Sequence, residues 1–137
     1  MWWIYALLSA LFAALTAICA KVGIKNVNPD LATAIRTVII LIMAWAIVFS
    51  RGAVNSINTL TKTTWIFLCL SGISTGLSWV FYFRALQLGK VSQVAAVDKL
   101  SLALAIVLSV LFLGETLNLK MAIGGTLIIV GTLVLIV

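Results

Sequence analysis

The chain has 137 residues, of which 64% are hydrophobic and only 9% carry a charged side chain. A soluble domain has about 45–50% apolar and about 25% charged residues, so a soluble chain of this length could not cover so apolar a core. These proportions exclude an ordinary soluble enzyme and a disordered chain. They indicate a small integral membrane protein, provided that the apolar residues are grouped into spans.

The formal net charge of +6 comes from nine Lys or Arg against three Asp or Glu. The basic residues are scattered singly along the chain, so no cluster follows a phosphate backbone and nucleic acid is not an expected partner. Single basic residues beside apolar segments are typical of contacts with lipid head groups. The lipid bilayer is therefore the first expected partner.

Five apolar stretches follow one another along the chain. Each is close to the ~20 residues that a helix needs to cross ~30 Å of hydrocarbon. The alternation that marks β-barrel strands is missing, and an unpaired backbone in lipid is too costly, so helices are expected. The predicted spans are residues 2–20, 31–49, 65–86, 91–113 and 119–137.

The connectors are short and rich in turn residues. The connector of residues 21–30 contains Asn28 and Pro29, which suit the cap and the first turn of the second helix. Residues 51–64 form the longest loop, and Gly89 and residues 114–118 mark the later breaks. The first span lacks the basic region that precedes a signal peptide, so a mature membrane helix is expected. The sequence therefore predicts one five-helix domain over residues 1–137.

The basic residues are divided almost evenly between the two sides of the membrane. With five spans, one side of the membrane has Arg51, Lys62 and Lys120, and the other has Lys21, Lys25, Arg84 and Lys90. Arg36 could be counted with the second side if its side chain extends to the membrane interface. Most membrane proteins show a clear excess of basic residues inside. Two hypotheses follow: a single orientation set by a weak bias, or insertion in both orientations with antiparallel pairing.

Charges within a membrane span are the first functional candidates. Asp98 and Lys99 lie about eight residues into the fourth span, which is ~12 Å along a helix and near the midplane. Adjacent side chains on a helix point ~100° apart, so the two are expected to face different partners. The alternative is that the fourth helix begins later, near residue 94 or 97, and that both charges are interfacial.

Polar and small residues follow helical spacing on three of the predicted helices. Together they could line one aqueous cavity with Trp79 in its wall, although hydrogen bonds between helices would use the same pattern. Arg36, roughly one turn into the second helix, is either a ligand group or a residue whose side chain reaches the membrane interface. The fifth helix carries Gly124, Gly125 and Gly131 and is expected to form a packing surface or a dimer surface. The stripes are Ser71, Thr75, Ser78 and Tyr82 on the third helix, Asp98, Ser101, Ala105 and Ser109 on the fourth, and Tyr5, Ser9, Phe12 and Thr16 on the first.

No catalytic pattern is present. The sequence has no Ser–His–Asp or Cys–His arrangement, no Gly-rich phosphate loop and no metal-ligand cluster, and three acids are too few for carboxylate catalysis. Neither an enzyme nor a cofactor or metal site is expected.

Several spaced motifs resemble the EamA domain of the drug/metabolite transporter superfamily. They are the segment Tyr82-Phe83-Arg84-Ala85-Leu86-Gln87-Leu88-Gly89, then Leu113-Gly114-Glu115, Gly124-Gly125 and residues 127–131, with Pro29 and Arg36 where the second helix opens. The resemblance covers the whole chain. Typical members carry ten helices as two inverted repeats of five, with the substrate path between the halves. The resemblance therefore implies an all-α bundle equivalent to one half of such a transporter. Many members have a proline near the position of Leu102; its replacement here predicts an unbroken fourth helix.

The predicted function is a secondary transporter subunit for a small organic solute in the cytoplasmic (inner) membrane. It would work by alternating access as a homodimer, with Asp98 as the proton or cation site and Lys99 as a counter-charge or anion site. A non-transporting assembly subunit and a passive channel are the alternatives. The expected binding set is Asp98, Lys99, Ser101, Ser71, Thr75, Ser78, Trp79, Tyr82, Tyr5 and Arg36.

Overall fold

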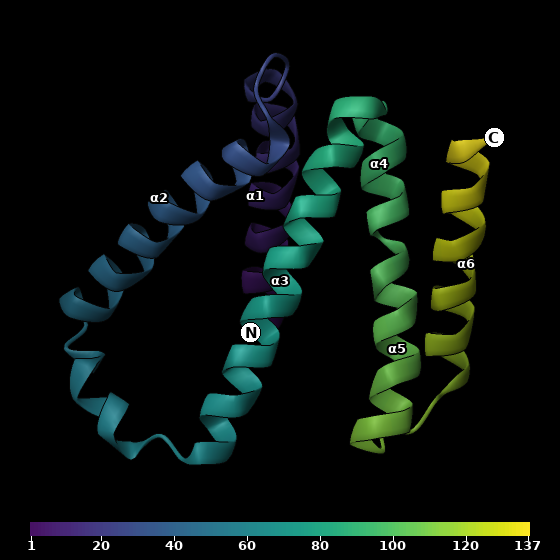
Figure 1. The fold of residues 1–137 in the computed structure, drawn as a ribbon. Helices are drawn as coiled ribbons and strands as arrows, with labels where there is room; N and C mark the ends of the chain where they lie inside the picture. The colour runs from purple at the N-terminus through teal and green to yellow at the C-terminus, as the bar shows by residue number, and fades with distance from the viewer. The chain divides into compact units, whose positions relative to one another are not determined.

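The computed structural model describes residues 1–137 and contains helices and connectors but no strands. Figure 1 shows the helices in chain order. They are α1 (Trp2–Gly23), α2 (Pro29–Ser50), the 3₁₀ helix η1 (Ala53–Thr59), α3 (Lys62–Leu88), α4 (Val91–Asp98), α5 (Leu100–Leu113) and α6 (Leu119–Ile136).

Five segments are long and apolar enough to cross a membrane. Four are single helices, α1, α2, α3 and α6, and the fifth is Val91–Leu113, which joins α4 and α5. The all-α fold with five membrane-spanning segments is therefore confirmed. Most of their large apolar side chains are exposed in the isolated chain, as expected of surfaces that lipid or a partner covers in the membrane.

Local sequence explains where the helices begin and end. The Asn28 side chain accepts hydrogen bonds from the backbone N–H of Asp30 (2.8 Å) and Leu31 (3.3 Å), and Pro29 opens α2, as predicted. Asn118 caps α6 through the N–H of Met121 (2.9 Å). Gly114 ends α5 at φ 68°, a left-handed conformation that favours glycine.

The prediction of an unbroken fourth helix was wrong. The helix is interrupted at Lys99, which lies between α4 and α5. The Lys99 N–H donates to the carbonyl of Ala96 (3.1 Å), and the N–H of Leu102 donates to the carbonyl of Lys99 (3.0 Å). Both bonds span three residues, which is the 3₁₀ pattern. The break therefore arises without proline, through a local tightening of the backbone.

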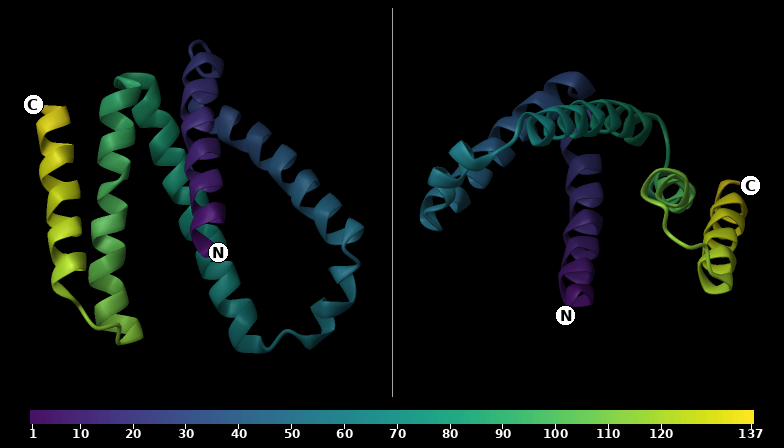
Figure 2. Two further views of the ribbon diagram at one scale, coloured as in Figure 1. Left: turned by 180° about the vertical axis from the view of Figure 1, so that it is seen from behind. Right: turned by 90° about the horizontal axis from the view of Figure 1, so that it is seen from below.

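The chain divides into two compact units, each described by itself. The α4–α6 unit consists of residues 88–137 with residues 1–19. Within it α6 packs along both α4 and α5, as the two sets of views show (Figures 1 and 2). A Cβ added at Gly125 would lie 3.5 Å from Cδ1 of Ile106. This close approach agrees with the packing role expected for the fifth predicted helix.

The α2–α3 unit consists of residues 20–87. The end of α1, the connector to α2 and the end of α3 come together around a small core, and α2 and α3 diverge from there towards η1 (Figures 1 and 2). The core residues of this unit are Ala20, Ile24, Thr33, Phe83 and Leu86.

Candidate functional site

The break between α4 and α5 carries an ion pair. Nζ of Lys99 lies 3.7 Å from Oδ2 of Asp98, and both side chains are partly exposed in the isolated chain. The expectation that these neighbours face different partners was therefore wrong. The 100° separation applies to a regular helix, whereas the tight turn at Lys99 (φ −70°, ψ −11°) and a long flexible side chain bring the charges together.

A hydroxyl from α6 supports the backbone beside this ion pair. Oγ1 of Thr132 donates to the carbonyl of Ala96 (3.1 Å), and Thr132 is buried. The same carbonyl accepts the N–H of Lys99. This role of Thr132 is not predictable from the sequence, because a lone threonine on an apolar helix does not reveal which carbonyl it contacts.

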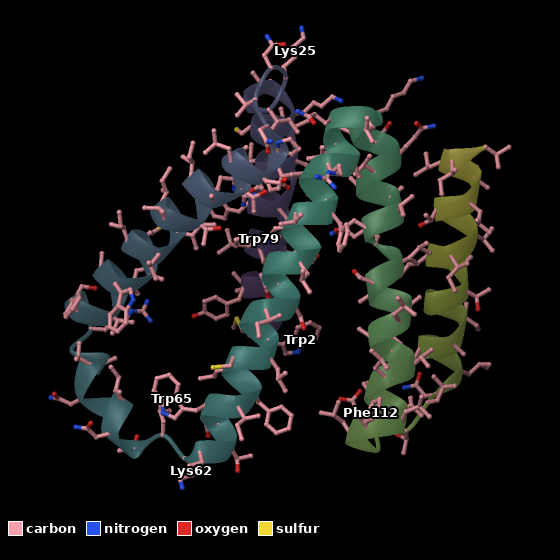
Figure 3. The ribbon with its side chains drawn as sticks, in the orientation of Figure 1. Trp2, Lys25, Lys62, Trp65, Trp79 and Phe112 are labelled. Carbon is pink, nitrogen blue, oxygen red and sulfur yellow. The ribbon has the colours of Figure 1, made fainter.

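A further charge within a span is that of Arg36, which belongs to α2 and whose guanidinium contacts α3. Its Cζ is 5.0 Å from the ring centroid of Trp79 and 4.6 Å from that of Phe83. Both distances are within the range of cation–π attraction. Trp79, labelled in Figure 3, and Phe83 are four residues apart, so they lie on one face of α3. The structure thus brings together two predicted residues, Arg36 and Trp79, and adds Phe83, whose i+4 spacing from Trp79 was the available signal.

No carboxylate pairs with Arg36. The only acid of the α2–α3 unit is Asp30, whose Oδ2 lies 3.4 Å from Nη2 of Arg84. Arg36 is half-buried against the two rings. The guanidinium is therefore held by aromatic faces while its charge is not neutralised within the unit.

The predicted stripe on the third helix is present along α3. Ser71, Thr75 and Ser78 are exposed, and the Thr75 hydroxyl donates to the carbonyl of Ser71 (2.9 Å) in its own helix. Tyr82 is half-buried, with its ring edge-on to that of Phe83 at 6.1 Å. Tyr5 on α1 and Ser101 on α5 are exposed. That these residues line a single cavity stays a prediction.

Polar groups also fasten the end of α3 to the first connector. Nε2 of Gln87 donates to the carbonyls of Ile24 (3.1 Å) and Val27 (2.7 Å). Nζ of Lys21 donates to the carbonyl of Leu86. The Gln87 bonds satisfy two carbonyls of the connector after α1, and the Lys21 bond satisfies one near the end of α3, so together they fix the connector beside the small core.

Five apolar spans define a multi-pass membrane protein. The chain belongs to the EamA-like transporter family, whose model matches residues 1–137. A Sinorhizobium protein described as an "uncharacterized transporter in cobO 3'region" is 51% identical over 136 residues, which cover 99% of this chain and 96% of that relative. No solved structure matches the chain. The resemblance drawn from the sequence motifs is therefore confirmed, and the chain is a membrane transporter.

Proposed function

We propose that the protein is a secondary transporter of a small organic solute, working in the cytoplasmic membrane by alternating access as an antiparallel homodimer. The family match supports transport. The Sinorhizobium relative is itself little longer than one five-helix unit, because the match covers 96% of it. A five-helix chain needs a second unit to reproduce the two halves of an inverted-repeat transporter.

The observation that carries the proposal is the helix break at Asp98 and Lys99 inside the fourth span. Helix breaks in transporters bring charged groups to the midplane, where substrates and coupling ions bind. Asp98 is the proton or cation site, because a carboxylate can take up and release a proton during the cycle. Lys99 is its counter-charge when the carboxylate is ionised.

The antiparallel arrangement is supported by the even distribution of basic residues. With five spans, three basic residues belong to one side of the membrane and four or five to the other. This difference gives little preference for one orientation of the chain. In such a pair the fourth spans cross near the midplane, so Asp98 of one copy can approach Lys99 of the other. The polar residues of α3, Ser71, Thr75 and Ser78, would line the path between the copies.

Purified protein in pyranine-loaded proteoliposomes tests the coupling role. Pools of amino acids, sugars and short organic acids are added outside, and the internal pH is followed. We expect saturable, solute-driven proton movement in the wild type and its loss in Asp98→Asn, because an amide cannot carry a proton. Glu115→Gln, which changes a carboxylate outside the spans in the same way, is the matched control and should behave as the wild type.

Each alternative has its own result. Proton movement that is equal in Asp98→Asn and the wild type would remove Asp98 from the coupling site. Flux without saturation would indicate a channel, and no flux with any pool would favour an assembly subunit. Orientation reporters at the C-terminus test the dimer: dual insertion predicts comparable signals from both sides, and a strong shift when lysines are added to residues 51–64.

A further inference from the structure

We propose that Arg36, Trp79 and Phe83 form a recognition site for an oxyanion on the transported solute, a carboxylate or phosphate group. The proposal rests on the proposed transport function and narrows its substrate to anionic solutes. It concerns the α2–α3 unit alone, where all three residues lie.

The site lies within the span and not at its mouth. Arg36 is the eighth residue of α2, so its Cα is about 11 Å from the start of the helix. Phe83 and Trp79 are five and nine residues from the end of α3, or about 8 and 14 Å. A cation at this depth is costly unless it is compensated, which makes Arg36 a functional candidate.

The two rings compensate the charge but leave the hydrogen-bonding edge of the guanidinium available. Cation–π attraction acts on the face of the aromatic rings and uses no N–H donor. The five N–H groups of Arg form a rigid fork that matches the two oxygens of a carboxylate or phosphate. Because the contacts with Trp79 and Phe83 are made through the faces of those rings, α3 orients the guanidinium without using its N–H fork for them.

Two other cations of the helices have carboxylate partners. Lys99 pairs with Asp98, and near the end of α3 Arg84 pairs with Asp30. The remaining acid, Glu115, lies in the connector between α5 and α6. Arg36, the eighth residue of α2, has no carboxylate partner in its unit, and an anionic solute would balance its charge.

Tryptophan fluorescence tests the site directly. Replacing Trp2, Trp3, Trp45 and Trp65 by Phe leaves Trp79, which contacts the guanidinium, as the single tryptophan. The protein in phosphatidylcholine nanodiscs is titrated with sodium succinate and sodium phosphate at constant ionic strength, with tetramethylammonium chloride as the cationic comparison. Thermal shifts of the unsubstituted protein with the same salts provide a second readout.

We expect saturable changes with at least one of the two oxyanions and none with tetramethylammonium. Arg36→Gln should raise the apparent Kd at least about tenfold, because the bonds to a charged donor are lost. The apparent Kd of Arg36→Lys should lie between those of the wild type and Arg36→Gln, because lysine keeps the charge but lacks the forked N–H groups. Arg51→Gln, outside the spans, is the control and should match the wild type.

Two results would overturn the proposal: no saturable response to either oxyanion in both readouts, or equal affinity in Arg36→Gln and the wild type. A response that requires phosphatidylglycerol in the nanodisc and ignores the soluble salts would also overturn it, because Arg36 would then bind lipid head groups. Oxyanion binding without transport would keep the site and refute the transporter. Transport of neutral or cationic solutes without oxyanion binding would support the transporter and refute the oxyanion site.

Discussion

The α2–α3 and α4–α6 units each hold charge within a membrane span, but by different means. In the α4–α6 unit the charges are neighbours in sequence, and a tightened backbone turn lets them pair. In the α2–α3 unit a single cation is held by two rings of another helix. The first arrangement is local and nearly neutral, whereas the second depends on helix packing and leaves a net positive charge. Mutations should therefore affect the two units differently.

The largest effect is expected from Phe83→Ala. Phe83 is fully buried and also contacts Arg36, so its loss leaves a cavity and removes one aromatic face. Thermal unfolding in detergent should show a loss of about 3 kcal/mol, the lower end for a buried Phe. Phe67→Ala, at an exposed position of α3, is the control and should change little. Equal losses would show that α2 and α3 do not depend on this core.

Asp98→Asn should cost less, because the pair is partly exposed. The substitution leaves the Lys99 charge without its partner, and we expect a loss of about 1 kcal/mol. The double variant Asp98→Asn with Lys99→Gln removes both charges and should recover most of this loss. If the double variant is the less stable one, the pair is not what holds the turn together.

Thr132→Val tests the support that α6 gives to the break. It removes the hydroxyl that donates to Ala96 and keeps the side-chain volume, so a loss near 0.6 kcal/mol is expected, typical of such bonds in membranes. Thr126→Val is a matched control, because the Thr126 hydroxyl bonds to Ala122 in its own helix. A double-mutant cycle with Asp98→Asn should show coupling for Thr132 and none for Thr126.

The smallest effect is expected from Arg84→Gln. The ion pair with Asp30 is exposed at both ends and 3.4 Å long, so it should contribute at most about 0.5 kcal/mol. The effect should shrink further at high salt, because exposed charges are screened. A loss as large as that of Phe83→Ala would mean that the ion pair, and not the apolar core, joins α2 to α3.

The sequence predicted the five spans because their length and apolar content leave one solution in lipid, and Asn28 and Pro29 located the start of α2 correctly. The break at Lys99 could not be predicted, because no proline marks it. It results from two backbone hydrogen bonds that span three residues each, and the side chains around Lys99 do not specify such bonds. The partners of Arg36 and Thr132 come from other helices, and sequence periodicity gives a face without its neighbour. Asp98 and Lys99 were chosen for their depth, but their pairing depended on the local turn.

The double hydrogen bond of Gln87 also sets an order on synthesis. The Gln87 side chain of α3 donates to two carbonyls of the connector between α1 and α2, and Lys21 of α1 donates to the carbonyl of Leu86 in α3. A ribosome completes that connector some sixty residues before Gln87 exists, as the sequence separations of 63 and 60 show. The bonds that fasten the first connector can therefore form only after the third span has been made.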